Sequence, residues 1–141
     1  MAPPISVSRA MRVAEFRAAL RDFQSQNESI LRELGMTPQR YLLLLFVKGA
    51  LDGSSRPTMT ELRERMKLSP NTVTELVDRV ARDGLVVRDA GIDDQRVVFV
   101  RLTAKGTRAV DEAIRATTAQ RREFALRFDT LARTFAAALR G

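Results

Sequence analysis

The feature that most limits the fold of this chain is a close series of helix boundary signals between residues 58 and 84. Thr58-Met59-Thr60-Glu61 fits the Ser/Thr-x-x-Glu capping box that begins many helices. Lys67-Leu68 interrupts that short helix, and Ser69-Pro70 supplies an N-cap followed by proline at the first helical position. Gly84 stands just past the end of the second helix, where a C-cap glycine belongs. The spacing therefore predicts two short helices joined by a tight turn.

The residues that follow predict a β-hairpin. Leu85-Val86-Val87-Arg88 is short and β-branched, residues 90–95 are turn-like, and Arg96 to Leu102 is typical of a second strand. Thr103 then caps another helix, with Gly106 in its first turn at a position that allows close backbone approach. Two helices with a tight turn, followed by a hairpin, are the order of a winged helix-turn-helix. The predicted fold class is mainly α with a small β-hairpin wing.

The segment before this motif predicts a buried helix. Gly35 is placed to end a preceding helix, and Thr37-Pro38 begins the next with an N-cap and proline at the first position. The run from Tyr41 to Ala50 is almost wholly apolar. A helix that is apolar all round is expected to be central and buried.

Both ends of the chain predict long helices with narrow apolar stripes. From residue 8 to residue 34, apolar residues recur in steps of three and four, and Asn27 occupies the missing position. The pattern returns from Thr103 to Leu139, with a break expected near Phe128-Asp129, where Asp129 would cap a last helix. Taken alone, the first stripe is as well suited to an intramolecular core, with Asn27 turned aside, as to packing against a second copy.

Composition narrows the chemistry. The chain has no cysteine and no histidine, which excludes disulfides, thiolate metal sites, cysteine nucleophiles and a Ser-His-Asp triad. No other spacing pairs a base with a nucleophile, so we expect neither an enzyme nor a bound metal or cofactor. The net charge of +7 favours a polyanionic partner, nucleic acid first, although the charge is spread along the chain without a basic block. No signal peptide or membrane segment is recognisable, and a cytoplasmic location is expected.

The second helix of the predicted helix-turn-helix has the chemistry to enter the major groove of DNA. Its apolar stripe faces inward, and its opposite face carries Asn71, Thr72, Thr74, Glu75, Asp78, Arg79 and Arg82. Arg96, at the hairpin tip, is a long cation able to enter an adjacent minor groove or to pair with phosphate.

The motifs in this order resemble the multiple antibiotic resistance regulator (MarR) family. The resemblance rests on Glu61-Leu62-x-x-x-Met66, on Ser69-Pro70-x-Thr72-Val73-Thr74-x-Leu76-Val77-Asp78-Arg79-Val80, on Asp83-Gly84-Leu85-Val86-x-Arg88, and on Asp94-x-Arg96 followed by Leu102-Thr103-x-x-Gly106. Leu34-Gly35-Met36-Thr37-Pro38-x-Arg40 is also similar, although the family usually has glutamine at or near the last place and here Gln39 precedes Arg40. The likeness covers nearly the whole chain.

The resemblance implies an obligate homodimer that binds a pseudo-palindromic, double-stranded DNA operator as a transcriptional regulator, usually a ligand-responsive repressor. It implies a dimerisation helix in residues 1–36, a DNA-binding lobe in 37–106 and dimerisation helices in 107–141. The DNA contacts it implies are Ser69, Asn71, Thr72, Thr74, Glu75, Arg79, Arg88, Asp94 and Arg96. Asp94 would orient Arg96 or a neighbouring arginine, and the alternative for it is a plain turn residue. Arg101 on the second wing strand either touches phosphate or is solvated. The dimer contacts it implies are Val13, Phe16, Leu20, Phe23, Phe124, Phe128, Leu131 and Phe135.

The chain also departs from parts of that family. Sensing through cysteine oxidation or through zinc bound by histidine and cysteine is excluded because those residues are missing. A small phenolic or anionic effector would have to be held by arginine, tyrosine or amide groups. Arg40 and Tyr41 are candidates, and the alternative for them is a surface cation and a core ring. The alternative function is a winged-helix module for protein–protein contact without specific DNA binding.

Overall fold

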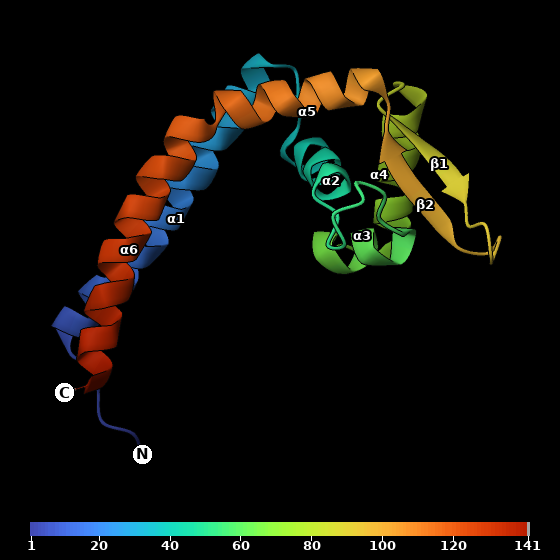
Figure 1. Cartoon of the computed structure of the whole chain (residues 1–141). Helices are drawn as coiled ribbons and strands as arrows, with labels where there is room; N and C mark the ends of the chain where they lie inside the picture. The colour runs from blue at the N-terminus through green and yellow to red at the C-terminus, as the bar shows by residue number, and fades with distance from the viewer. Residues whose placement is uncertain (141) are drawn as a thin grey trace. The chain divides into compact units, whose positions relative to one another are not determined.

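The computed structural model describes residues 1–140, with the side chains of residues 1–137. Two compact units form: residues 1–30 together with residues from 116 onward, and residues 31–115. Figure 1 shows the order of elements, which is α1 (Val7–Glu33), α2 (Pro38–Lys48), α3 (Met59–Met66), α4 (Pro70–Arg82), β1 (Val86–Ala90), β2 (Val98–Leu102), α5 (Ala104–Ala116) and α6 (Thr118–Arg140). The predicted C-terminal segment 107–141 ends on Gly141, which lies outside the described residues.

The local signals in the sequence begin and end the helices of the 31–115 unit. The Thr37 hydroxyl accepts the Arg40 amide at 3.2 Å, and the Thr58 hydroxyl accepts the Glu61 amide at 3.0 Å. The Glu61 carboxylate does not complete a reciprocal capping box, because it accepts the Leu51 amide at 3.1 Å instead. Lys67, at φ +55°, is left-handed and turns the chain between α3 and α4.

Gly84 ends α4 as predicted. Its φ of +76° lies in the region that favours glycine, and the Leu85 amide donates to the Val80 carbonyl at 3.1 Å. With the Gly84 amide bonded to the Ala81 carbonyl at 2.9 Å, this is a Schellman motif. Gly35 ends α1 with the same pattern, in which the Met36 amide donates to the Leu31 carbonyl at 2.9 Å.

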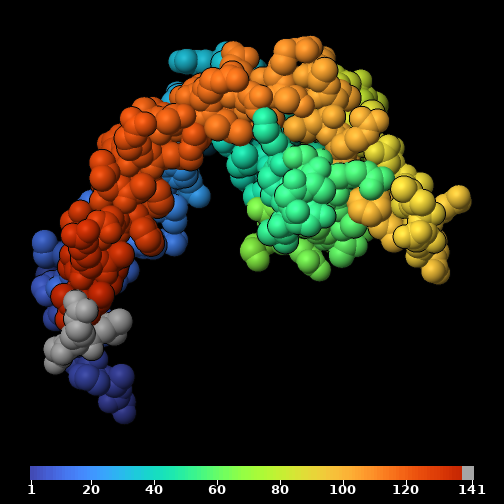
Figure 2. Space-filling model, viewed as in Figure 1, coloured from blue at the N-terminus to red at the C-terminus, as the bar shows by residue number. Residues whose placement is uncertain are grey.

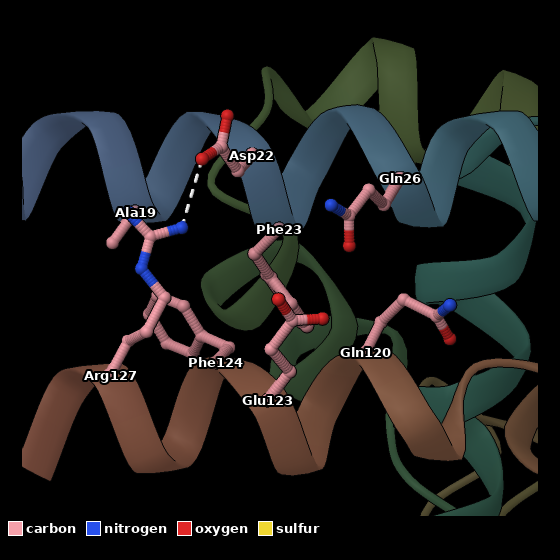
Figure 3. A pocket seen from close by; sticks show the side chains of 8 residues that line it. All are labelled: Ala19, Asp22, Phe23, Gln26, Gln120, Glu123, Phe124 and Arg127. Atoms are coloured by element: carbon pink, nitrogen blue, oxygen red, sulfur yellow. Dashed lines mark hydrogen bonds and ion pairs between the residues drawn. The ribbon is translucent and has the colours of Figure 1, made fainter.

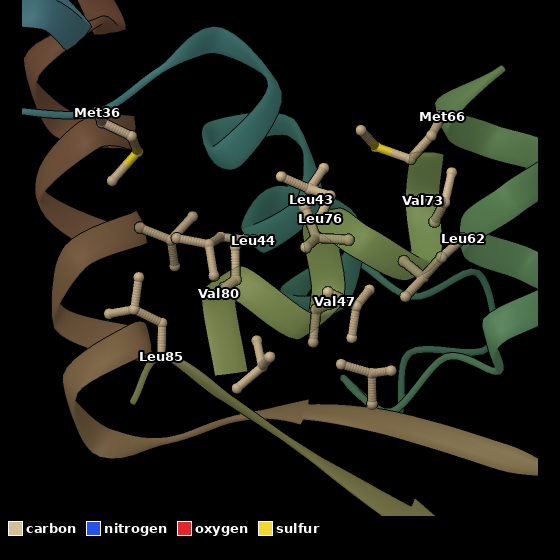
Figure 4. Close-up of a cluster of buried hydrophobic side chains, with 14 of the residues drawn as sticks. Met36, Leu43, Leu44, Val47, Leu62, Met66, Val73, Leu76, Val80 and Leu85 are labelled. Carbon is tan, nitrogen blue, oxygen red and sulfur yellow. The ribbon is translucent and has the colours of Figure 1, made fainter. Parts of the chain in front are cut away.

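A single hydrophobic core fills the 31–115 unit (Figure 4). The predicted apolar stripe of α4 is buried throughout, at Val73, Leu76, Val77 and Val80. The prediction for α2 was too broad, because only part of that helix faces the core. Leu43, Leu44 and Val47 are buried, whereas Leu42 is 39% exposed on the opposite side.

The hairpin is shorter than the sequence predicted. β1 and β2 pair antiparallel from Val86 opposite Leu102 to Ala90 opposite Val98, so Arg96 and Val97 belong to the connecting loop and not to the second strand. The loop closes on itself, since the Gly91 amide donates to the Val97 carbonyl at 2.8 Å. In the space-filling view, the yellow-to-gold hairpin loop projects from the rest of its unit (Figure 2).

The start of α5 packs directly on Gly84 and Leu85, just before β1, and Thr103 and Gly106 are the cap and the close backbone approach that the sequence predicted. The Thr103 hydroxyl accepts the Gly106 amide at 3.0 Å and donates to the Gly84 carbonyl at 2.6 Å. A Cβ atom on Gly106 would stand 1.9 Å from the Leu85 carbonyl oxygen. Only glycine fits this contact.

In the other unit, α1 and α6 lie side by side and their predicted stripes face each other. The Phe23 and Phe124 rings are 4.7 Å apart, and Phe16 contacts Phe128 at 5.9 Å and Phe135 at 6.0 Å between centroids. Leu20 and Leu131 are half-buried, while Val13 and Phe128 remain 48% and 44% exposed. Asn27 turns to its own helix and donates to the Phe23 carbonyl at 2.9 Å. The stripes therefore contact each other within one chain, and their contact with a second chain stays a prediction.

Arg127 joins the two helices of this unit. Its guanidinium reaches from α6 to Asp22 on α1 at 2.9 Å (Figure 3). It also reaches Glu15 on α1 at 2.7 Å. The hydrogen bond to Asp22, followed by that to Glu15, raises the pKa of Arg127 above its ordinary value.

The predicted helix break near Phe128-Asp129 was wrong. The chain instead breaks at Thr117, a fully buried residue whose carbonyl accepts the Arg121 amide at 3.2 Å. Asp129 is an interior helical residue that pairs with Arg133 one turn later at 2.9 Å. An aspartate is suited both to capping a helix and to an exposed ion pair within one, so the sequence alone did not distinguish the two roles of Asp129.

Candidate nucleic-acid interface

The hydroxyl groups at the start of α4 are engaged in capping the helix. The Ser69 hydroxyl accepts the Thr72 amide at 3.2 Å, and the two hydroxyl oxygens lie 2.6 Å apart. The Thr74 hydroxyl donates to the Pro70 carbonyl at 3.0 Å and accepts from an Arg63 terminal nitrogen at 3.3 Å. These residues hold their predicted place, but their hydroxyls already have partners. Each hydroxyl therefore has less hydrogen-bonding capacity left for a base, whereas the methyl groups of Thr72 and Thr74 can still make apolar contact with a thymine methyl.

Three other side chains of α4 point to solvent without any partner among the described residues. Asn71, Glu75 and Arg79 are exposed, and none of their side chains makes a hydrogen bond or an ion pair there. Their spacing of four residues places them in one line along the helix. An amide, a carboxylate and a guanidinium are the groups that pair with adenine, cytosine and guanine edges, respectively, in a major groove. We call this line the α4 ridge.

The hairpin loop presents one long cation. The Arg96 side chain is 93% exposed. The Asp94 carboxylate fixes the part of Arg96 nearest the backbone, because Asp94 Oδ1 accepts the Arg96 backbone amide at 3.0 Å and the Arg96 Nε–H at 3.1 Å. The hydrogen bond from the Arg96 side chain, and after it the one from the Arg96 amide, lowers the pKa of Asp94 below its ordinary value. Asp94 thus orients Arg96, in agreement with the sequence.

The two arginines of the hairpin strands both have carboxylate partners. Arg88 on β1 pairs with Asp78 on α4, and this contact connects the hairpin to α4. Arg101 on β2 pairs with Asp89 on β1 at 2.9 Å. Each would have to share its charge between a carboxylate and a phosphate, so a DNA contact by Arg88 remains a prediction.

Two further arginines near this surface were not singled out from the sequence. Arg56 lies 4.0 Å over the centre of the Phe99 ring and 3.5 Å from Asp89. Arg63 on α3 reaches Thr74 on α4 and lines a groove beside Arg96. Both contacts join segments that are far apart in the chain, so no local sequence pattern predicts them.

The two effector candidates occupy different environments. Arg40 pairs with Asp83 and lines a surface groove with Gln39, Leu76 and Arg79. Tyr41 is half-buried and packs against the hydrophobic core. The structure thus brings Arg40, and not Tyr41, beside the α4 ridge.

Other classes of site find no support in the described part of the chain. No group of three or more acidic side chains there could hold a metal ion. No helix among the described residues has the length and apolar character needed to cross a membrane.

Two short helices across a tight turn, a ridge of polar side chains on the second helix and an arginine-tipped hairpin define a winged helix-turn-helix protein. The chain belongs to the MarR family of transcriptional regulators. A sequence model of the MarR family matches residues 34–96, which run from the end of α1 to the wing loop.

Relatives and solved structures agree with this assignment. The HTH-type transcriptional regulator YkoM of Bacillus subtilis is 31% identical over 111 residues, which cover 75% of this chain and 67% of YkoM. The HTH-type transcriptional repressor MdtR of the same organism is 28% identical over 98 residues, covering 70% of this chain and 61% of MdtR. The MarR family regulator Sco3205 of Streptomyces coelicolor, solved in complex with DNA, matches with a TM-score of 0.74 at 20% identity, over 99% of this chain and 88% of that one.

Proposed function

We propose that this protein binds double-stranded DNA in a sequence-specific manner as a homodimer, on a pseudo-palindromic operator. The observation that carries the proposal is the α4 ridge, whose three exposed polar side chains have no partner in the described part of the chain, on a helix whose other face is buried. An α-helix fits the major groove of B-DNA, which is about 12 Å wide. Arg96 on the projecting loop would then reach the neighbouring minor groove or its phosphates. The structural neighbour Sco3205 was solved in complex with DNA, which supports DNA as the partner.

The homodimer rests on the apolar surface of the α1–α6 unit. Packing α1 on α6 leaves several large apolar side chains in solvent, which are Ile5, Val7, Met11, Val13, Leu126 and Phe128. A large exposed apolar patch marks an interaction site, and we take these side chains to form one. A second copy related by two-fold symmetry covers this surface and supplies the second α4 that a palindromic operator requires.

The regulatory effect proposed is repression relieved by a small anionic or phenolic effector. The relative MdtR is named as a repressor, which supports repression over activation. Arg40 and Arg79 line one groove, so an anion held there competes with DNA for the Arg79 guanidinium. The probe is 4-hydroxybenzoate, which carries both a phenol and a carboxylate. It should weaken DNA binding by the native protein and have no effect on an Arg40→Gln variant that still binds DNA.

The experiment that tests specific DNA binding is selection of tight-binding duplexes from a random-sequence library. We expect an inverted repeat whose half-site centres lie about one helical turn or a multiple of it apart. Arg96→Ala should weaken binding to selected and scrambled duplexes alike and make the log–log salt slope shallower by about 1.8 for the two copies in a dimer. A protein–protein module would yield no enriched sequence and no steep loss of binding with salt.

A further inference from the structure

A groove between α3 and the hairpin gathers positive charge outside the α4 ridge. It is lined by Thr58 and Thr60 at the start of α3, by Arg63 one turn further on, and by Arg96 and Val98 of the hairpin. The two sides are fixed to each other, because Thr58 forms a bridge with Phe99 on β2 and the Val100 amide donates to the Pro57 carbonyl at 2.9 Å. The lining residues include two cations and no carboxylate.

Few of the hydrogen-bond donors of Arg63 have a partner among the described residues. Its Nε atom is buried and has no hydrogen-bond partner among the described residues. Among the side chains that the structure describes, its one hydrogen bond runs from a terminal nitrogen to the Thr74 hydroxyl and is long at 3.3 Å, and no carboxylate there pairs with it. The nearby Glu61 carboxylate is already used by the Leu51 amide and by Arg65 at 3.8 Å. A guanidinium offers five donors, and Arg63 as a whole is only half-buried, so its terminal nitrogens remain able to donate to an anion from outside the protein.

The position of Arg63 indicates what supplies the missing charge. It touches the first turns of α4 through Thr74 and shares a groove with Arg96 of the hairpin loop. The sugar–phosphate backbone of duplex DNA is what separates the major groove from the minor groove. Arg63 contacts the helix that is proposed to enter the major groove and shares a groove with the loop that is proposed to reach the minor groove, so it is placed beside the strand that runs between the two.

We propose that the groove between α3 and the hairpin binds one backbone phosphate of the DNA, and that Arg63 is its principal ligand. The inference rests on the proposed DNA-binding function and adds a contact outside α4 and the wing tip. Arg63 donates to the phosphate oxygens through its terminal nitrogens, and the exposed Thr60 hydroxyl is placed to donate as well. The contact fixes the register of the helix on the duplex without reading a base.

The test compares Arg63→Gln with Arg108→Gln on a selected and on a scrambled duplex. Arg108 is an exposed cation on α5, outside the groove, so both variants lose the same charge. We expect Arg63→Gln to weaken both duplexes by a similar factor, about tenfold, and to reduce the salt slope by about 1.8 for two copies. Arg108→Gln should leave affinity and slope nearly unchanged.

A second measurement separates a phosphate ligand from a residue that only supports Thr74. Single neutral methylphosphonate linkages are placed at successive positions of the duplex. One position per half-site should weaken the native protein but have no further effect on Arg63→Gln. Arg63→Lys, which keeps the charge and loses the planar fork, should retain the native salt slope.

Three outcomes overturn the inference. The first is a native salt slope in an Arg63→Gln variant that melts at the native temperature. The second is that no methylphosphonate position is coupled to Arg63 although the native protein binds the selected duplex, which leaves the proposed function standing. The third is that the native protein binds no duplex at all, which removes the inference together with the proposed function.

Discussion

At the scale of the residue, the hydrogen bonds made within the protein determine which side chains of α4 are free to contact bases. The sequence predicted the same role in the major groove for Asn71, Thr72, Thr74 and Glu75. In the structure the hydroxyls of Ser69, Thr72 and Thr74 serve the helix itself, whereas Asn71 and Glu75 have no partner among the described side chains. The exposed face of α4 could be predicted from the helical spacing of its apolar residues. Which of its polar side chains are free to contact a base depends on hydrogen bonds that this spacing does not reveal.

Thr72 permits a test of that division. Thr72→Ser keeps the hydroxyl that meets Ser69 and removes the methyl, so we expect a native melting temperature and a smaller operator-to-random ratio of affinities. Thr72→Val keeps a methyl and removes the hydroxyl, so it should lower stability by about 1 kcal/mol and retain the ratio. Thermal melting and binding isotherms on both duplexes check this. The opposite assignment of effects to the two variants contradicts a methyl contact.

The Asp94–Arg96 pair predicts a pH dependence confined to acid solution. The hydrogen bonds from Arg96 lower the pKa of Asp94 below 3.8, its value in an unfolded chain. The contribution of this pair is therefore complete above about pH 4 and is lost as the pH falls through the lowered pKa. Titration of the Asp94 carboxyl and the Arg96 Nε–H by NMR should show a common midpoint below 3.8. A midpoint at or above that value would mean that Asp94 does not hold Arg96 in solution.

At the scale of the element, boundaries marked by local chemistry were predicted well and boundaries set by tertiary contacts were not. The caps at Thr58, Ser69 and Gly84 lie where the sequence placed them, because each satisfies backbone groups within one helical turn. The break at Thr117 and the short β2 have no such local signal. The first coincides with burial of Thr117, and the second with closure of the wing loop onto itself.

The contact between α5 and the hairpin base gives a prediction on stability. Gly106→Ala places a Cβ 1.9 Å from the Leu85 carbonyl oxygen, so one of the two segments must move. We expect a loss of about 3 kcal/mol in the free energy of unfolding, measured with urea. Gly49→Ala is the matched control, since its Cβ would lie 3.2 Å from the Leu45 oxygen at a negative φ. Equal losses of unfolding free energy for the two variants would show that the close approach of Gly106 to Leu85 does not destabilise the alanine variant.

At the scale of the whole molecule, the fold class and the family could be predicted from the order of motifs, whereas the partner of the terminal helices could not. An apolar stripe with steps of three and four fits a helix of the same chain and a helix of another chain equally well. The structure places the two stripes against each other and leaves apolar side chains exposed, so an intramolecular pair that also dimerises is consistent with both readings.

Dimerisation is predicted to be inseparable from folding. Leu20→Glu or Phe16→Glu introduces a charge between α1 and α6 and should give unfolded or aggregated protein. Arg17→Glu, at an exposed position of the same helix, is the control and should remain dimeric. Sedimentation of the native chain at micromolar concentration should show a dimer. A stable, well-folded native monomer would rule out the proposed role of the terminal helices.

The most direct test of sequence-specific DNA recognition is the ratio of affinities for a selected duplex and a scrambled duplex, measured for the native protein and for ridge variants. The native protein should prefer the selected duplex by about a thousandfold or more, with affinity falling steeply as salt rises. Asn71→Ala and Arg79→Ala should each reduce that ratio by about 1–3 kcal/mol per base pair misread. Glu75→Ala should reduce the ratio while raising affinity for the scrambled duplex, because it removes a negative charge facing phosphates. Equal affinity of the native protein for both duplexes, or ratios that none of the three variants alters, would contradict recognition by α4.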